Sequence, residues 1–327
     1  MPRYSVIVPV YNRPQEVDEL LESLTKQSFR DFEVVIVEDG STYRCETVVE
    51  RYSNKLAVQY LFKPNSGPGP SRNFGYTMAK GEYLVVFDSD CIIPPGYFEA
   101  VEEVLKQNHI DAWGGPDRAH ENFTPRQRAM GYTMSSVLTT GGIRGGKKHL
   151  GWFQPRSFNM GISQRVFKET GGFRFDRYAE DIEFSIRMKN AGYHVVLIDR
   201  AFVFHKRRTT FQEFFRQVQN FGKGRALIGK AYPAEVKITH WFPTLFSLGL
   251  AITPFLLFVN PWLFRAASSG YALYFLGILI DSWRNNGFLV GILSIPSALL
   301  QLTGYGSGFL KEYIKTHSTN SGVSQSK

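Results

Sequence analysis

The sequence has little of what marks several common protein classes. Its 327 residues include two cysteines, Cys45 and Cys91, which excludes a disulfide framework or a cysteine-bound metal cluster and is typical of reduced thiols in a cytoplasmic domain. The first apolar run, residues 4–10, is too short for an export signal, and we interpret it as a buried strand. Charged residues make up 20% and hydrophobic residues 43%, which excludes a disordered chain. We find no internal repeats.

The charge that is present is unevenly placed. The formal net charge is +9, and residues 201–240 hold eight Lys and Arg against Glu213 and Glu235. A basic balance favours anionic partners such as nucleic acid, nucleotide phosphates or an acidic membrane. Because this basic stretch ends where a long apolar region begins, it favours a membrane surface over nucleic acid.

Charged residues are nearly absent from residues 241–310, where only Arg265, Asp281 and Arg284 occur. Residues 238–264, 266–280 and 285–310 contain no Asp, Glu, Lys or Arg, and the first and last of these runs are long enough to cross a bilayer. The middle run has 15 residues, which is short for a crossing unless Arg265 and Asp281 snorkel, so it is either a third span or a re-entrant or tilted segment. These runs predict a membrane domain of two or three helices over 238–315, followed by a disordered tail over 316–327. The alternative is a buried soluble bundle.

A helix is predicted just before the membrane domain, within the region 209–237. Thr210 and Glu213 have the spacing of a capping box. The stripe that follows consists of Phe211, Phe214, Phe215, Val218 and Phe221. We expect an amphipathic helix lying in the membrane interface, the alternative being a helix packed on a protein core.

Residues 1–200 alternate between strand-like and helix-like segments. Short apolar runs at 6–10, 33–37, 83–87 and 194–198 are typical of buried strands, and 14–27 has helical spacing. This alternation predicts an α/β domain over 1–208, with a mixed, mainly parallel sheet and flanking helices. Such sheets bind ligands at the carboxyl ends of their strands.

Two carboxylates, Asp88 and Asp90, directly follow the strand-like run 83–87. Acids at alternate positions can share one Mg²⁺ or Mn²⁺ ion, which would clamp a diphosphate. The alternative is that they cap the next helix. His205 follows another strand-like run and is a candidate third ligand, or else a structural histidine.

Further polar groups follow other predicted strands or open helices. Glu38 and Asp39 end the second strand, where an acid can accept hydrogen bonds from a base or ribose. The glycine-proline loop 65–73 suits a close approach to phosphate, with Arg72 as a bidentate donor; the alternative is a rigid turn with a solvated arginine. Glu180 and Asp181 open a helical stretch, either as partners of the helix dipole or as a general base.

The order of these motifs resembles the family 2 glycosyltransferases, which have the GT-A fold. The resemblance covers residues 4–208 and rests on a set of short motifs: Val8–Asn12, Glu38–Ser41, Arg72–Gly75, Asp88–Asp90, Asn159–Gly161, Gly171–Phe173, Glu180–Asp181 and Arg187. The stretch 205–226 with the apolar C-terminal third is similar to membrane-attached bacterial members.

The resemblance implies a role for each matching position. Asp181 is expected to be the base that deprotonates the acceptor hydroxyl, with Glu180 beside it. Asp90 is expected to bind the divalent cation, helped by Asp88 and His205. The expected nucleotide-sugar contacts are Pro9, Tyr11, Asp39, Arg72, Asp88 and Gly115, with Trp113 and Gly114 also lining the sugar or acceptor side.

One departure separates the sequence from the processive synthases. Their Gln-x-x-Arg-Trp motif is missing, because Gln217 and Gln219 are followed by Asn220-Phe221-Gly222. We therefore expect transfer of a single sugar. The basic segment 141–148 matches no motif and is interpreted as a lid over phosphates or a plain solvated loop.

Together these observations predict a metal-dependent, inverting hexosyltransferase. The expected donor is a UDP- or GDP-sugar, and the expected acceptor is a hydroxyl of a lipid-linked glycan in cell-surface polysaccharide synthesis. We expect a multi-pass protein of the bacterial inner membrane with a cytoplasmic catalytic domain. The alternatives are a polyprenyl-phosphate sugar transferase and a catalytically silent membrane scaffold.

Overall fold

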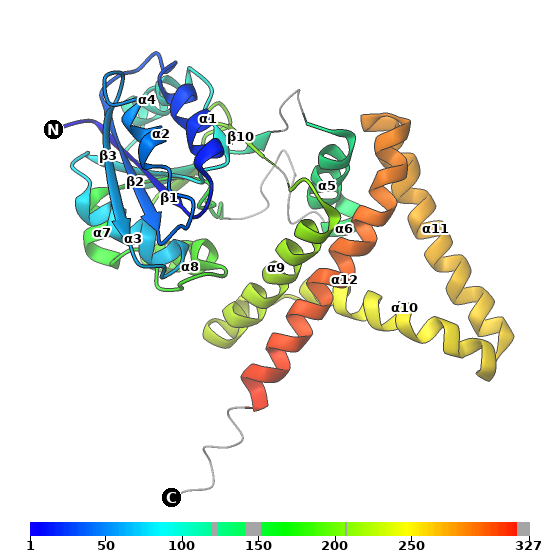
Figure 1. The fold of residues 1–327 in the computed structure, drawn as a ribbon. Helices are drawn as coiled ribbons and strands as arrows, with labels where there is room; N and C mark the ends of the chain where they lie inside the picture. The colour runs from blue at the N-terminus through cyan, green and yellow to red at the C-terminus, as the bar shows by residue number, and fades with distance from the viewer. Residues whose placement is uncertain (119–122, 141–151, 207, 319–327) are drawn as a thin grey trace, which may run out of the picture. The chain divides into compact units, whose positions relative to one another are not determined.

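The computed structural model describes residues 1–118, 123–140, 152–206 and 208–318 (Figure 1). These residues form two compact units, the first made of 1–118 and 152–206 and the second of 123–140 and 208–318. The chain therefore leaves the first unit and returns to it. The expected continuous domain 1–208 is wrong in this respect, because 123–140 packs with the C-terminal helices.

A seven-stranded sheet forms the centre of the first unit, in the order β3–β2–β1–β4–β8–β6–β9. Its strands are β1 (Tyr4–Val10), β2 (Phe32–Asp39), β3 (Ala57–Lys63), β4 (Tyr83–Phe87), β6 (Ala112–Gly114), β8 (Asn159–Ser163) and β9 (Val195–Leu197). β8 runs antiparallel to β4 and β6, while the other neighbouring strands are parallel. The predicted mixed, mainly parallel sheet is confirmed.

Helices cover both faces of this sheet, because alternate residues of each strand point to opposite sides. In β1, Val6 and Val8 belong to one buried cluster and Ile7 to the other. The first cluster includes residues of α1 (Pro14–Leu24), α2 (Glu46–Glu50) and α4 (Tyr97–Gln107). The second includes residues of α3 (Pro68–Met78), α7 (Gln164–Thr170) and α8 (Glu180–Asn190).

A second, three-stranded sheet lies beyond the end of β4. It consists of β5 (Cys91–Ile92), β10 (Val203–His205) and β7 (Asp117–Arg118), with β10 in the middle. In its antiparallel pairing, His205 lies opposite Cys91. This pairing brings the end of the first unit back to the residues that follow β4.

The second unit is helical. Its helices are α5 (Pro125–Ser135), α6 (Val137–Thr140), α9 (Phe211–Ala231), α10 (Phe242–Val259), α11 (Pro261–Asn286) and α12 (Phe288–Ser318), with short 3-10 turns at Pro233–Glu235 and Ile238–Trp241. Among the described residues, three helical segments are long and apolar enough to cross a membrane: Ile238–Val259, Pro261–Asn286 and Phe288–Thr316.

The middle uncharged run of 15 residues lies within α11, one helix of 26 residues that continues past Arg265 and Asp281. Whether this segment is tilted or re-entrant stays a prediction. The expected tail does not begin at Thr316, because α12 continues to Ser318.

The predicted capping box of α9 is confirmed, since Thr210 accepts from the Glu213 backbone and Glu213 accepts from the Thr210 backbone. Its apolar stripe is partly buried within the protein: Phe214 and Val218 pack with Met130 and Met134 of α5. For these two side chains, the alternative of a helix packed on a protein core describes the structure. Whether α9 also lies in a membrane interface stays a prediction.

Backbone contact between α9 and α12 yields a stability prediction. A Cβ at Gly222 would lie 2.1 Å from the Tyr305 carbonyl oxygen, whereas a Cβ at Gly277, also inside a helix, meets nothing within 4 Å. Gly222→Ala should therefore destabilise the protein by about 1–3 kcal/mol. Gly277→Ala, the matched control, should not lower stability. Thermal unfolding in detergent measures both, and equal effects would contradict the packing account.

Candidate functional site

The candidate site residues gather at one edge of the main sheet. Asp39 ends β2, Asp88 follows β4, and Pro9 lies in β1 with Tyr11 just beyond it. Because β1, β2 and β4 are parallel neighbours, their carboxyl ends meet at the same edge. Tyr11 is 54% exposed there, which makes it accessible to a ligand.

Arg72, from α3, lies between two of the predicted acids. Its Nη2 donates to Asp88 Oδ1 at 2.8 Å, and its Nη1 donates to Glu180 Oε1 at 2.8 Å. The guanidinium is buried, with 4% of the side chain exposed. Both terminal nitrogens thus bind carboxylates in this structure, and a role for Arg72 near the nucleotide stays a prediction.

The two acids that open α8 have different surroundings. Glu180 is buried against Arg72, and burial raises its pKa to about 7; Arg72 opposes this rise and Asp181 adds to it. Asp181 is more exposed, accepts from the Ile182 backbone at 2.8 Å, and lies 3.6 Å from Arg156 Nη1. Asp181 therefore has the more accessible carboxylate.

The residue before these acids, Ala179, has a left-handed backbone with φ of 57°. A non-glycine residue rarely adopts this conformation, and such local strain is concentrated at functional sites. Asn12, next to Tyr11, is the other described non-glycine residue with a positive φ. Its side-chain oxygen accepts from the backbones of Thr42 and Tyr43, which ties the β1 loop to the β2 loop.

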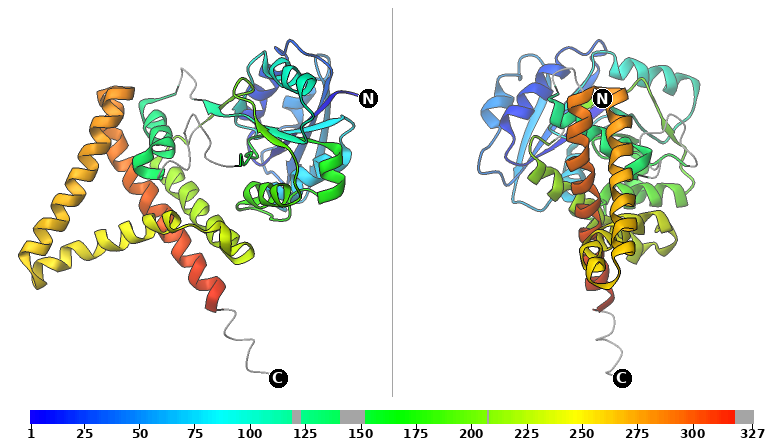
Figure 2. Two further views of the ribbon diagram at one scale, coloured as in Figure 1. Left: turned by 180° about the vertical axis from the view of Figure 1, so that it is seen from behind. Right: turned by 90° about the vertical axis from the view of Figure 1, so that its right-hand side faces the viewer.

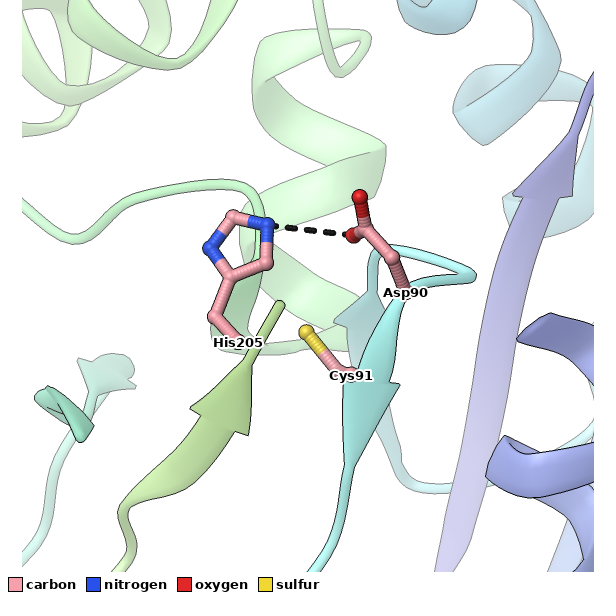
Figure 3. Close-up of side chains that lie close together, drawn as sticks. All are labelled: Asp90, Cys91 and His205. Atoms are coloured by element: carbon pink, nitrogen blue, oxygen red, sulfur yellow. Dashed lines mark ion pairs between the residues drawn. The ribbon is translucent and has the colours of Figure 1, made fainter. Parts of the chain in front are cut away.

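Asp90 and His205 come together as the sequence predicts, with Asp90 Oδ1 3.0 Å from His205 Nε2 (Figure 3). The backbone N–H of Lys206 also donates to the Asp90 carbonyl at 3.0 Å, which fixes the end of β10 against this turn. The other carboxylate oxygen of Asp90 pairs with Arg13. Asp88 does not join this pair, because its carboxylate binds Arg72.

This pair fits a divalent cation. Two ligands at about 2.1 Å from one ion and at right angles to each other lie roughly 3 Å apart, which is the separation between these atoms. Cys91 is the third member of the cluster, with its ligand atom within 4.8 Å of the others. Burial raises the pKa of the Cys91 thiol well above its usual range, so it is a poor ligand beside the oxygen and nitrogen donors.

Asp39 is engaged by the loop that opens α3. Its carboxylate accepts from the Ser66 and Gly67 backbones, each at 2.9 Å, and from Lys63 Nζ at 2.5 Å. Burial opposes ionisation, but these hydrogen bonds outweigh it and lower the pKa of Asp39. A contact between Asp39 and a nucleotide base would require one of these partners to move.

The expected sugar-side residues have packing roles. Trp113 has no exposed surface and its Nε1 donates to Tyr97 at 3.3 Å, so its side chain belongs to the core. Whether the 113–115 segment lines the sugar or acceptor side stays a prediction. Gly115 allows a close backbone approach, because a Cβ there would lie 1.7 Å from the Ala201 carbonyl oxygen. The predicted lid, 141–148, lies outside the described residues.

Sequence reasoning missed two cations that touch the site acids. Arg13 pairs with Asp90 and Arg156 lies near Asp181. Arg13 lies three residues beyond the end of β1. Polar residues just after parallel strands are candidates for the site, so the sequence could have indicated Arg13. Arg156 lies in a segment with no motif, so the sequence carries no comparable signal for it.

Comparison with known proteins identifies the family. The family model described as glycosyl transferase family 2 matches residues 5–171, which is half of the chain. The chain therefore belongs to glycosyltransferase family 2, as its motifs indicate.

Relatives with curated descriptions include the poly(ribitol-phosphate) beta-N-acetylglucosaminyltransferase TarS of Staphylococcus aureus. It is 40% identical over 115 residues, which cover 34% of this chain and 20% of TarS. The uncharacterized glycosyltransferase EpsJ of Bacillus subtilis is 26% identical over 63% of this chain and 61% of EpsJ. The chain thus spans about a fifth of the length of TarS.

Solved structures share the fold. The mannosyltransferase PcManGT from Pyrobaculum calidifontis, solved with GDP-Man and Mn²⁺, has a TM-score of 0.56 at 20% identity and covers 99% of this chain, with 88% of PcManGT matched. TarS 1–349 of S. aureus in complex with UDP has a TM-score of 0.51 at 20% identity, covering 96% of this chain and 92% of the other. The predicted GT-A fold is confirmed.

The pKa of Glu180 gives a pH prediction. The unfolded chain releases the Glu180 proton above about pH 4.5, whereas the folded protein keeps it up to about pH 7. The contribution of Glu180 to the free energy of unfolding is therefore greatest at low pH and is lost as the pH rises through about 7. The unfolding free energy of wild type minus that of Glu180→Gln should fall by about 1 kcal/mol per pH unit across this window. Denaturant titrations in detergent measure it. A difference that rises with pH would show a lowered pKa instead.

Proposed function

We propose that this protein transfers one sugar from a nucleotide-diphospho sugar to an acceptor hydroxyl with inversion at the anomeric carbon. The observation that carries the proposal is the Arg72 bridge, which holds Asp88 and Glu180 on one guanidinium. The bridge joins the end of β4 to the start of α8. It thereby holds Asp88, which is expected near the donor, close to Glu180, the neighbour of the expected base Asp181.

Asp181 is the proposed general base. Its carboxylate is the more accessible of the two at the start of α8, and its partner Arg156 is only 3.6 Å away. In the proposed reaction, Asp181 takes the proton of the acceptor hydroxyl as that oxygen bonds to the anomeric carbon. The bond from this carbon to the diphosphate oxygen breaks, and the nucleoside diphosphate leaves with the electron pair.

Asp90 and His205 are the proposed holders of a divalent cation, Mg²⁺ or Mn²⁺. The PcManGT structure with Mn²⁺ supports a cation in this fold. A bound cation would supply positive charge to the leaving diphosphate. Arg13, paired with Asp90, places a further positive charge beside the same carboxylate.

The ligands bound in structures of this fold support the proposed class of sugar donor. The apolar helices support the proposed class of acceptor. GDP-Man and UDP-GlcNAc are bound in structures of this fold, which supports a GDP- or UDP-sugar. The three long apolar segments support attachment to a membrane. We therefore propose a lipid-linked glycan acceptor in cell-surface polysaccharide synthesis and a catalytic unit on the cytoplasmic face of the inner membrane.

Replacing the proposed base should separate turnover from donor binding. Asp181→Asn should lower the transfer rate by about 10²–10⁴-fold, because the amide cannot take the hydroxyl proton. Nucleotide-sugar affinity should change little. Asp176→Asn, at an exposed carboxylate before α8, is the matched control and should keep full activity. Nucleotide release from a panel of UDP- and GDP-sugars, with a lipid extract as acceptor, measures the rate.

Two results would contradict this assignment. Loss of nucleotide-sugar binding in a folded Asp181→Asn variant would contradict the assignment of Asp181 as the general base, because it would show a role in binding the donor. Persistent transfer by that variant to a phosphate acceptor would favour the polyprenyl-phosphate transferase.

Removal of the cation should stop transfer. Chelator should abolish nucleotide release, and added Mn²⁺ or Mg²⁺ should restore it. His205→Ala should raise the Mn²⁺ concentration for half-maximal activity more than about tenfold, because one ligand is lost. His194→Ala, at an exposed histidine of the first unit, is the control. Full activity in chelator would rule out the proposed cation site.

A further inference from the structure

The three long apolar segments differ in how far the protein itself covers them. In the most apolar window of each, 17% of residues are buried in Ile238–Val259 and 6% in Pro261–Asn286, but 44% in Phe288–Thr316. A helix at the outside of a membrane domain exposes apolar side chains to lipid along its length. α10 and α11 do so, with Leu248, Phe255 and Leu276 among their exposed residues.

The middle of α12 is more enclosed by the protein than α10 and α11, because nearly all of its side chains are buried or half-buried. Between residues 293 and 310, Ser307 is the one exposed residue. The exposed apolar side chains of α12 lie near its two ends, at Phe288, Leu289, Ile292 and Ile314. The views in Figures 1 and 2 agree that α9 runs along one side of α12, and that α10 and α11 diverge from another.

Charged helices cover the enclosed side of α12. α9 packs on it backbone to backbone: Cβ atoms at Gly222 and Gly308 would lie 2.1 Å from the carbonyl oxygens of Tyr305 and Gln219. The charged residues of α9 are Glu213, Arg216, Lys223, Arg225 and Lys230. If α12 crossed the hydrocarbon, it would carry these charges in with it, which is unfavourable.

The same holds at the other half of α12. Leu300 packs with Met130 and Met134 of α5, a helix that also carries Arg126 and Arg128. Arg128 Nη2 donates to the Asn286 carbonyl at 3.3 Å, at the end of α11. The end of α11 therefore lies in polar surroundings, beside the start of α12.

Both ends of the α10–α11 pair are attached to α12. At the start of α10, Thr244 Oγ1 donates to the Gly306 carbonyl at 3.3 Å. At the end of α11, the Ser282 and Ser294 hydroxyls are 2.7 Å apart. Ser294 and Gly306 are twelve residues apart, or about 18 Å along the helix. The turn at Asn260 lies at the far end of both helices, so α10 and α11 form a V that opens onto α12 (Figure 2).

We propose that only α10 and α11 cross the bilayer, as a helical hairpin, and that α12 lies along the membrane surface on the side of α5 and α9. The proposal rests on the membrane attachment proposed above and changes the number of crossings from three to two. With 18 and 26 residues, α10 and α11 are about 27 and 39 Å long, enough for a crossing by each.

The basic residues support this topology. Lys237, Arg284, Lys311 and Lys315 then lie on one side, while Arg265 is the one basic residue near the Asn260 turn. Excess Lys and Arg mark the cytoplasmic side. A three-crossing protein would instead carry Lys311 and Lys315 to the opposite side from the catalytic unit.

Site-directed labelling tests the proposal on the full chain. Single cysteines are introduced as Lys311→Cys at the end of α12, Asn260→Cys at the hairpin turn, and Asn54→Cys as the reference on the first unit; all three positions are exposed. The native Cys45 and Cys91 are buried, so wild type gives the background. A membrane-impermeant maleimide is applied to sealed vesicles of one orientation, before and after permeabilisation.

We expect Lys311→Cys and Asn54→Cys to react from the same side, and Asn260→Cys to react only from the other. Reaction of Lys311→Cys with Asn260→Cys on the side opposite Asn54→Cys would establish three crossings and overturn the proposal. Reaction of all three from one side would also overturn it. Carbonate extraction then tells whether the membrane attachment itself fails, because a released protein has no inserted hairpin.

A second measurement leaves the helices unchanged. An epitope tag is added after residue 327, and protease is applied to the outside of sealed spheroplasts. We expect complete protection of the tag until the cells are opened. Loss of this tag from intact spheroplasts, with a tag before residue 1 still protected, would put the two tags on opposite sides and overturn the proposal.

Discussion

The buried Arg72 guanidinium is the interaction on which the arrangement of the candidate site depends. It is enclosed between the carboxylates of Asp88 and Glu180, which are the two acids that form ion pairs with it among the described residues. Removing either carboxylate would leave a buried cation partly unpaired, which is costly. The same contact sets the distance between the end of β4 and the first turn of α8. The end of β4 and the start of α8 are thus held together by one side chain that itself touches little solvent.

The sequence predicts the parallel half of the sheet well, because β1, β2 and β4 are apolar runs buried on both faces. It does not predict β8, whose Asn-Met-Gly-Ile-Ser sequence has no strand-like run. Tertiary contacts determine this strand. The Asn159 amide donates to the Ala201 carbonyl, and a Cβ at Gly161 would lie 2.1 Å from Trp113, so only glycine leaves room for the indole. Residues that match family motifs can therefore have packing roles.

For the site, strand-end reasoning predicts where Asp39, Asp88 and Asp90 lie, and the pairing of Asp90 with His205 follows the expected pattern. It does not predict which partner each side chain selects. The glycine-proline loop suggests a phosphate contact for Arg72, but not that Asp88, just after β4, and Glu180 of α8 would enclose it. The partners Arg13 and Arg156 depend on loop conformations that periodicity does not encode. The membrane region shows the same limit, since composition identifies apolar helices but not which of them the protein itself encloses.

The order of segments along the chain has a consequence for synthesis on the ribosome. α5 and α6 are made before β8, yet their partners α9 and α12 are made after the first unit is complete. The apolar face of α5, with Met130 and Met134, therefore stays uncovered until the residues of α9 and α12 have been synthesised. A protein cut after residue 208 would keep this face and lose its cover. The two units consequently cannot be separated at a single position without leaving a surface prone to aggregation.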